Sequence, residues 1–217
     1  MSTQQKTAAI FIDAENLYFI QKALGWEIDF ERLYNFVATK YNIYNAFYYT
    51  VTDPTNDAFE EKNQFLASLS LIGYTVRKKE VKVIRVGDKY KKKGNLDIEM
   101  VIDMFNTKEL YERALLFSGD SDFERAIELL RSHGKESVVI STKGFVSREL
   151  INAADKFIDL QLLKSEIEKL PEDKGLRHTT VPGVLDLHGK PRKRMLAPRT
   201  RITPRKENTP PQSGNSV

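Results

Sequence analysis

The residues from 115 to 127 constrain the fold most, because a strand, a tight turn and a helix follow one another there. The apolar residues 115–117 are typical of the end of a buried strand, and 118–120 of a tight turn. From Asp122 onward, apolar residues recur at helical spacing. Asp120 and Asp122 are therefore expected at the carboxyl end of a strand, where ligands bind in open α/β sheets.

The same alternation of strand and helix patterns runs through most of the chain. Strands are expected at 8–12, 43–51, 74–77, 137–141 and 157–160, with an edge strand or ribbon at 78–86. Helices are expected at 16–24, 30–37, 55–71, 95–105, 122–133 and 147–154, and a charged helix up to about 170. In the 95–105 helix the expected core stripe is Ile98, Val101, Ile102 and Phe105. This order predicts an α/β fold with a parallel sheet covered on both faces.

Composition excludes several classes of protein. The chain has no cysteine, which rules out disulfides and thiolate metal sites and favours the reducing cytoplasm. With only three histidines in the chain, a histidine-based zinc site is not expected. No apolar run approaches the roughly 20 residues of a membrane span, and we expect neither a signal peptide nor a membrane partner. Any metal would have to be bound by oxygen ligands.

Charge divides the chain into a domain and a tail. Residues 171–217 hold 10 Lys and Arg against 4 Asp and Glu, and seven of the eight prolines. With few aliphatic and no aromatic residues, this segment is predicted to be a disordered basic tail. We therefore expect a flexible N-terminus at 1–6, one domain at 7–170 and the tail at 171–217. The basic run 190–194 fits a weak RNA tether and a solubilising tail equally well.

Three strand-to-helix junctions carry acidic residues. They are Asp13 after the first strand, Asp97 after Gly94 and Asn95, and Asp120 with Asp122 after the central strand. In a parallel sheet these four carboxylates would converge at one edge. Clustered carboxylates repel one another, so such a site makes physical sense mainly with a divalent cation. Oxygen ligands indicate Mg²⁺ or Mn²⁺, ions that commonly serve phosphoryl chemistry.

A structural interpretation of the same acids stays open. Asp is a favoured N-cap, so any one junction acid is more often a helix cap than a metal ligand. Asp103 lies about 240° around its helix from Asp97, which favours a solvated or supporting role over direct ligation. Glu99 and Glu15 are interpreted as surface residues. Spacing alone does not decide between caps and a metal site.

Residues 77–93 form a strongly basic segment that leads directly into Asp97. Lysines on an edge strand often serve only to discourage strand pairing, but a basic rim beside an acidic metal centre also suits a polyanionic substrate. Tyr90 is a candidate for base stacking, whereas core packing is favoured for Phe47, Tyr48 and Tyr49. The candidate RNA-binding residues are Lys82, Arg85, Lys89, Lys91, Lys92 and Lys93.

Three motifs in order give the chain a family resemblance. They are Phe11 to Asn16, then Lys93 to Asp97 with Asp103 and Met104, then Ser118 to Phe123. Over about residues 7–160 the chain resembles the NYN domain (LabA-like), a branch of the PIN-like nucleases. One local departure is Phe123-Glu124-Arg125, where the family usually has proline in the third position.

The resemblance implies a PIN-like three-layer α/β/α sandwich with a mainly parallel sheet and a Mg²⁺-dependent ribonuclease site. Carried over residue by residue, the catalytic and metal-binding acids are Asp13, Asp97 and Asp120, with Asp122 close by. Asn16, Ser118 and Asp103 are then supporting groups.

Three hypotheses follow from these residues. The first is a metal-dependent RNase acting on RNA, and the second is a catalytically silent PIN-like module that binds RNA or a protein and regulates. A haloacid-dehalogenase-type phosphatase fits poorly, because that family needs a second Asp two residues after the nucleophile and Glu15 follows Asp13. The sequence does not identify the RNA, nor whether the chain forms a homo-oligomer.

Overall fold

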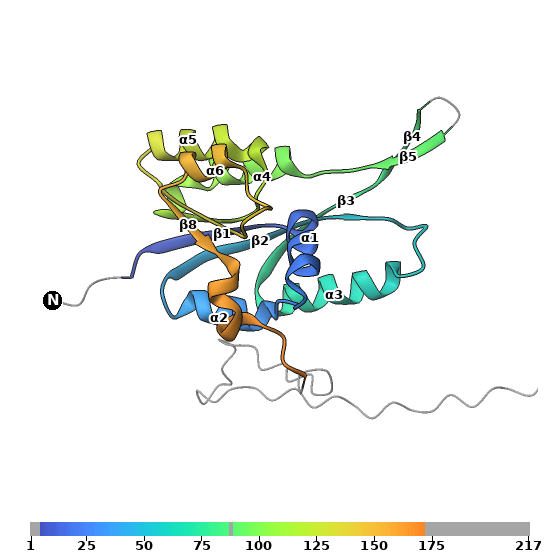
Figure 1. The fold of residues 1–217 in the computed structure, drawn as a ribbon, viewed down its shortest axis with the longest axis horizontal. Helices are drawn as coiled ribbons and strands as arrows, with labels where there is room; N and C mark the ends of the chain where they lie inside the picture. The colour runs from blue at the N-terminus through green and yellow to red at the C-terminus, as the bar shows by residue number, and fades with distance from the viewer. Residues whose placement is uncertain (1–4, 87–88, 172–217) are drawn as a thin grey trace, which may run out of the picture.

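A computed structural model describes residues 5–86 and 89–171, with the backbone alone from 84 to 93. Its central sheet consists of β1 (Thr7–Asp13), β2 (Asn42–Thr52), β3 (Tyr74–Glu80), β6 (Arg113–Phe117), β7 (Glu136–Ser141) and β8 (Lys156–Asp159). The α-helices are α1 (Ala14–Leu24), α2 (Phe30–Ala38), α3 (Phe59–Ile72), α4 (Asp97–Asn106), α5 (Glu124–Ser132), α6 (Arg148–Ala153) and α7 (Lys164–Ile167). Figure 1 shows helices on both faces of the sheet, which confirms the predicted three-layer α/β/α sandwich.

The order of the strands creates a natural binding edge. The order is β3-β2-β1-β6-β7-β8, and every neighbouring pair is parallel. The chain proceeds outward from β1 to β3 on one side and from β6 to β8 on the other, so the direction of progression reverses between β1 and β6. Ligands of open α/β sheets bind outside the carboxyl ends of strands at such a switch point. Asp13 ends β1, and Ser118 directly follows β6.

Alternation along β1 divides the core into two layers. Ala8, Ile10 and Ile12 pack in one cluster with side chains of α1, α2 and α3. Ala9 and Phe11 point to the opposite face and pack in a second cluster with side chains of α4, α5 and α6. All five residues are completely buried. This continuous burial is why β1 is an uninterrupted apolar run, as expected of a parallel strand covered on both faces.

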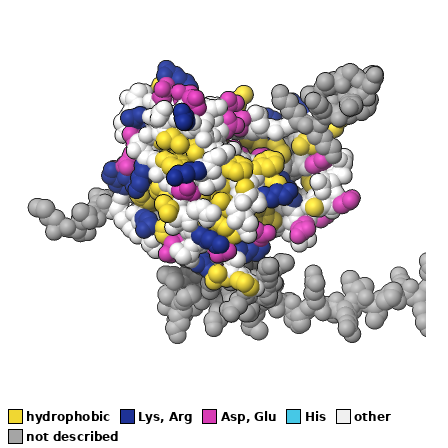
Figure 2. Space-filling model, viewed as in Figure 1, with side chains coloured by type: hydrophobic (Ala, Val, Ile, Leu, Met, Phe, Trp, Pro, Cys, Tyr) yellow, Lys and Arg dark blue, Asp and Glu magenta, His cyan; other side chains and the backbone are white. Residues whose placement is uncertain are grey.

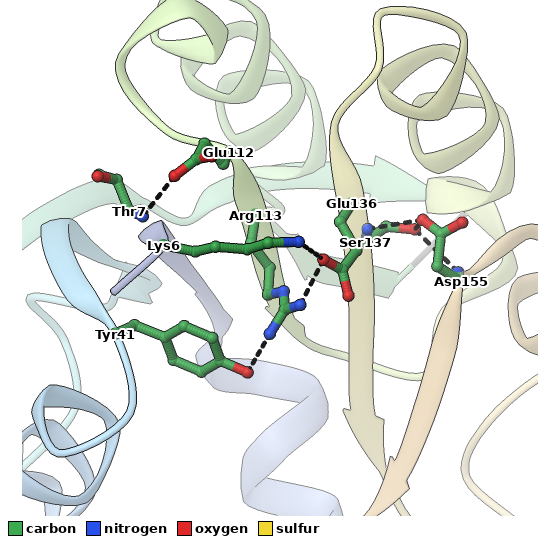
Figure 3. A network of polar contacts seen from close by, with 8 residues as sticks. All are labelled: Lys6, Thr7, Tyr41, Glu112, Arg113, Glu136, Ser137 and Asp155. Carbon is green, nitrogen blue, oxygen red and sulfur yellow. Dashed lines mark hydrogen bonds and ion pairs between the residues drawn. The ribbon is translucent and has the colours of Figure 1, made fainter. Parts of the chain in front are cut away.

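The amino-terminal edge of the sheet is closed by polar contacts between neighbouring strands (Figure 3). Arg113 at the start of β6 donates to Glu136 at the start of β7 and to Tyr41. Lys6 Nζ lies 2.9 Å from Glu136 Oε2 and adds a second cation to the same carboxylate. The amide of Thr7 donates to Glu112 Oε2 at 2.9 Å. These contacts link the amino-terminal ends of β1, β6 and β7 to one another.

The most buried face of helix α4 is rotated from the predicted one. Its buried residues are Met100 and Met104, both with no exposed surface. Of the predicted core stripe, Val101 and Phe105 are partly buried and pack against the core, as predicted. Ile98 is 71% exposed and Ile102 is 51% exposed, so the prediction was wrong for these two residues. Apolar residues surround the helix on several sides, and periodicity alone could not select the face that packs on the sheet.

The segment 78–86, predicted to be an edge strand or ribbon, forms both structures. Its first part completes β3, and β4 (Lys82–Val86) pairs antiparallel with β5 (Lys89–Lys93) in a separate two-stranded ribbon. Figure 1 shows this ribbon extending away from the body of the molecule. Lys82 is exposed. The side chains of Arg85, Lys89, Tyr90, Lys91, Lys92 and Lys93 lie outside the described residues, as do the predicted basic tail from 172 onward and residues 1–4.

Helix length and polarity give one further result. Within 5–86 and 89–171, none of the helices combines the length and the apolar character needed to traverse a bilayer.

Candidate functional site

The carboxyl-terminal edge of the sheet holds a cavity of about 340 Å³. All four junction acids of the sequence analysis line it, although they come from three separate segments of the chain. The complete lining is Asp13, Glu15, Asn16, Phe19, Tyr49, Gly94, Asn95, Leu96, Asp97, Met100, Asp120 and Asp122. Parallel strands explain this convergence, because their carboxyl ends meet at one edge.

Asp13 is both a helix cap and a cavity residue. Its Oδ1 accepts a hydrogen bond from the amide of Asn16 at 3.1 Å, which caps α1. Its Oδ2 accepts a second bond from Ser118 Oγ at 3.0 Å. Burial raises the pKa of Asp13, and the charge of Asp120 acts in the same direction, while the two hydrogen bonds oppose the rise. The capping and site interpretations of this residue are therefore compatible.

Asn16 and Ser118 connect helix α1 to the turn after β6. Asn16 Oδ1 accepts a hydrogen bond from the amide of Gly119 at 2.9 Å. Ser118 is fully buried, and its Oγ accepts from the amide of Asp120 at 3.2 Å while donating to Asp13. Both side chains thus hold the two acidic junctions in a fixed relation, as expected of supporting groups.

Gly119 fixes the position of the turn through a close backbone approach. A Cβ atom at this residue would lie 1.7 Å from the carbonyl oxygen of Phe145 and 2.9 Å from Ser141 Oγ. The Gly119 carbonyl accepts from the amide of Ser147 at 3.0 Å. Only glycine allows the 142–147 loop to pack this closely against the turn that carries Asp120.

Asp97 carries the clearest electrostatic sign of a shared site. It begins α4, and its Oδ2 accepts a hydrogen bond from Asn95 Nδ2 at 2.7 Å. Burial raises the pKa of Asp97 to about 6, and the charges of Asp13, Asp120 and Asp122 add to the rise. Four carboxylates from three junctions therefore influence one another across the cavity.

Asp120 and Asp122 form the side of the cavity at β6. Asp120 is the N-cap of a short 3₁₀ helix (Ser121–Phe123), and its Oδ1 accepts from the amide of Asp122 at 3.0 Å. The predicted helix at 122–133 thus starts with this 3₁₀ turn and continues as α5. The turn is anchored by Phe123, which is fully buried beneath it.

Asp103 lies outside the cavity lining but contacts it indirectly. It accepts hydrogen bonds from the hydroxyl of Tyr49 at 3.0 Å and from Arg77 Nε at 2.9 Å. Tyr49 lines the cavity, so Asp103 and Arg77 hold one of its walls. Burial and the charge of Asp103 raise the pKa of Tyr49 far above its ordinary value, so the phenol stays protonated and donates.

The cavity lining also contains Glu15 and Phe19, which the sequence analysis does not assign to the site. Glu15 was expected to be a surface residue; it is exposed but also lines the cavity, and its Oε1 accepts from Thr50 Oγ1 at 3.2 Å. The only sequence signal for Phe19 is its spacing: it follows Asn16 by three residues and so shares its face of α1. The surface interpretation of Glu99 agrees with its ion pair to Lys79, at 2.7 Å.

The residue types suit a hard cation, whereas their present spacing does not form a complete site. Carboxylate and amide oxygens are the ligands that Mg²⁺ and Mn²⁺ prefer. A cation would also offset the repulsion among Asp13, Asp97, Asp120 and Asp122, which adds to the effect of burial on the pKa of Asp97. In the part of the chain that the structure describes, however, no group of three or more His, Cys, Asp or Glu side chains is close enough to hold a metal ion.

Comparisons with known proteins show the family and the fold of the chain. The family model of the NYN domain matches residues 7–163. The chain is 45% identical over 175 residues to the low amplitude and bright protein LabA of Synechococcus elongatus, covering 78% of this chain and 91% of LabA. It also resembles the crystal structure of a protein of unknown function from Vibrio parahaemolyticus, with a TM-score of 0.64, 22% identity, and coverage of 78% of this chain and 99% of that one. The chain therefore belongs to the NYN-domain, LabA-like family.

Proposed function

We propose that this chain is a metal-dependent ribonuclease that hydrolyses RNA phosphodiester bonds at the acidic cavity. The observation that carries the proposal is the convergence of Asp13, Asp97, Asp120 and Asp122 on one cavity at the switch point of the sheet. Membership of the NYN family supports it, because NYN domains are typically nucleases.

The four carboxylates are the proposed ligands of Mg²⁺ or Mn²⁺, held directly or through water. When bound, such an ion neutralises the phosphate and lowers the pKa of a coordinated water. Asp13, Asp97 and Asp120 are the primary candidates, and Asp122 would complete the set or orient the attacking water. Asn16 and Ser118 would keep the two sides of the cavity in register through the hydrogen bonds described above.

The basic segment beside the cavity would contact the RNA backbone. Arg77 and Lys79 already form ion pairs with Asp103 and Glu99, so these two cations serve mainly to position α4. We therefore assign phosphate binding to the ribbon beyond them, at Lys82, Arg85, Lys89, Lys91, Lys92 and Lys93. Such contacts would give binding that weakens as salt concentration rises.

A cleavage assay tests the proposal. Full-length protein and its Asp120→Asn variant are incubated with single-stranded and structured RNAs, with Mn²⁺, with Mg²⁺ and with EDTA. We expect cleavage by the wild type that requires a divalent ion and is lost in the variant. Asp57→Asn is a matched control, because Asp57 is an exposed carboxylate on the loop before α3 and lies outside the cavity lining. Equal cleavage by wild type and Asp120→Asn would contradict the proposal.

One observation favours a second candidate function. The acids of the described residues are not assembled into a metal-ligand set, as would suit a catalytically silent PIN-like module that binds RNA or a protein partner and regulates. This candidate predicts RNA binding that is unaffected by EDTA, without cleavage under any of the conditions above. The absence of cysteine favours the cytoplasm for either function.

A further inference from the structure

Two neighbouring aromatic side chains are exposed on helix α1, next to the acidic cavity. Phe19 is 58% exposed and Tyr18 is 52% exposed. Their ring centroids are 5.5 Å apart, with an angle of 73° between the ring planes. Phe47 and Tyr49 of β2 cannot stack on a base, because each is only 2% exposed and packs in the core. Core packing is thus confirmed for these β2 residues, and the exposed rings near the cavity come from α1.

The position of Phe19 connects it to the proposed reaction site. The residue lines the cavity together with the four acids. It follows Asn16 by three residues on α1, so its ring lies about one helical turn, ~5 Å, further along the same helix face. Asn16 in turn accepts a hydrogen bond from the amide of Gly119, in the turn that carries Asp120. A ligand phosphate among the carboxylates would therefore have the phenyl ring beside it.

The surroundings of the two rings suit a nucleotide better than a purely apolar partner. Lys22 is exposed, and its Nζ lies 5.4 Å from the centre of the Tyr18 ring. Two aromatic rings and a cation therefore lie next to the acidic cavity, which is the proposed site of the divalent ion. Figure 2 shows apolar side chains gathered at the centre of this face, where Figure 1 places α1. Isolated exposed aromatics are common and need no function, but these rings adjoin each other and the cavity.

We propose that Phe19, supported by Tyr18, is a stacking platform for an unpaired base of single-stranded RNA, adjacent to the phosphate held in the cavity. The inference rests on the proposed function in taking the cavity as the phosphate site. Every base has a π face, so such a platform binds without strong sequence preference. In a duplex the bases are stacked on one another and cannot reach the ring. The platform therefore selects single strands over duplexes.

Binding measured without cleavage tests this platform. A fluorescently labelled single-stranded RNA and a duplex of the same length are titrated with full-length protein, with Ca²⁺ in place of Mg²⁺ or Mn²⁺ so that carboxylates can still bind a divalent ion. Affinity is followed by fluorescence anisotropy, and a gel verifies that the RNA stays intact. Base–aromatic stacking contributes enough that Phe19→Ala should weaken single-strand binding by about 5- to 100-fold. Duplex binding should not change. Phe19→Tyr should restore single-strand binding, whereas Phe19→Leu, which is apolar but not aromatic, should not.

Tyr44→Ala is the matched control, because Tyr44 is an exposed aromatic near the start of β2, at the opposite edge of the sheet. It should bind both RNAs like the wild type. A second readout uses Phe19→Trp, whose indole fluorescence should be quenched by single-stranded RNA. The sole native tryptophan, Trp26, is only 5% exposed, so the wild type should show little quenching.

The outcomes separate this inference from the proposed hydrolysis. Weaker single-strand binding by Phe19→Ala without any RNA cleavage by the wild type would support the platform and contradict the nuclease. Cleavage by the wild type with equal binding by Phe19→Ala and no quenching in Phe19→Trp would overturn the platform and leave the nuclease standing. The platform would also be overturned if Phe19→Ala lost the same affinity for the duplex as for the single strand. It would be overturned as well if the wild type did not bind single-stranded RNA.

Discussion

Replacing Asp97 with asparagine should stabilise the metal-free protein at neutral pH. Burial and the charges of Asp13, Asp120 and Asp122 hold the pKa of Asp97 at about 6, against an ordinary value of 3.8. Below about pH 3 the carboxyl is protonated in both the folded and the unfolded chain. As pH rises from about 4 to about 6, the unfolded chain releases this proton first, so the wild type loses stability over this window. Asparagine is never charged and avoids this loss.

The size of the effect follows from the environment of Asp97. A pKa raised from 3.8 to about 6 corresponds to about 3 kcal/mol. The side chain is partly exposed, so solvent screening reduces this to about 1.5 kcal/mol. Asparagine also loses about 0.5 kcal/mol of favourable interaction with the dipole of α4, since Asp97 is in its first turn. The expected net gain is about 1 kcal/mol, or about 2–4 °C in melting temperature.

Chemical denaturation in EDTA measures this difference directly. Wild type and Asp97→Asn are unfolded in urea at several pH values between 4 and 8, with Asp57→Asn as a surface control. The stability advantage of Asp97→Asn should be near zero or slightly negative at pH 4 and reach about 1 kcal/mol above pH 6.5. An advantage that is the same at pH 4 and pH 7.5, or a less stable variant at pH 7.5, would refute the electrostatic reasoning.

Three further predictions concern the turn after β6 and the proposed binding of Mn²⁺. Gly119→Ala should destabilise the fold by about 2 kcal/mol or more in urea denaturation, because a Cβ would lie 1.7 Å from the Phe145 carbonyl oxygen; an unchanged midpoint would contradict this contact. Ser118→Ala should cost about 1 kcal/mol by removing the donor to Asp13 and should raise the pKa of Asp13 further, as NMR titration can detect. Millimolar Mn²⁺ should raise the melting temperature of the wild type in a thermal-shift assay and that of Asp120→Asn much less; equal shifts would argue against the proposed ligands.

The sequence was sufficient to place the acidic residues of the cavity. Parallel strands share an edge for their carboxyl ends, so Asp13 and Asp120 could be assigned to that edge from strand patterns alone. The same reasoning could not orient α4, because Met100 and Met104 compete with Ile98 and Ile102 for the core and all four are apolar. The choice depends on how the helix meets the sheet, which is a tertiary effect that local periodicity does not contain.

Long-range contacts explain the other features that the sequence did not predict. The space at Gly119 is set by a loop more than twenty residues later in the chain, around Phe145. Asp103 lies far around α4 from the predicted core stripe, which favoured a solvated position. The fully buried residues of the helix, however, are Met100 and Met104. Asp103 lies three residues after Met100, on the inner side of α4, which explains its contact with Tyr49. The role of Phe19 could be recognised only once the cavity had been located.

The most direct test of the central claim is the rate of RNA cleavage with Mn²⁺ by full-length wild type and Asp120→Asn, prepared identically. Asp120 is the acid at the carboxyl end of the central β6 strand, and its replacement leaves the other four carboxylates of the cavity lining, Asp13, Glu15, Asp97 and Asp122, in place. If the cavity is a metal-dependent nuclease site, the wild type cleaves, EDTA abolishes cleavage, and Asp120→Asn is at least about 100-fold slower. Cleavage that persists in EDTA, or that proceeds equally in Asp120→Asn, would contradict the assignment of this cavity as the active site.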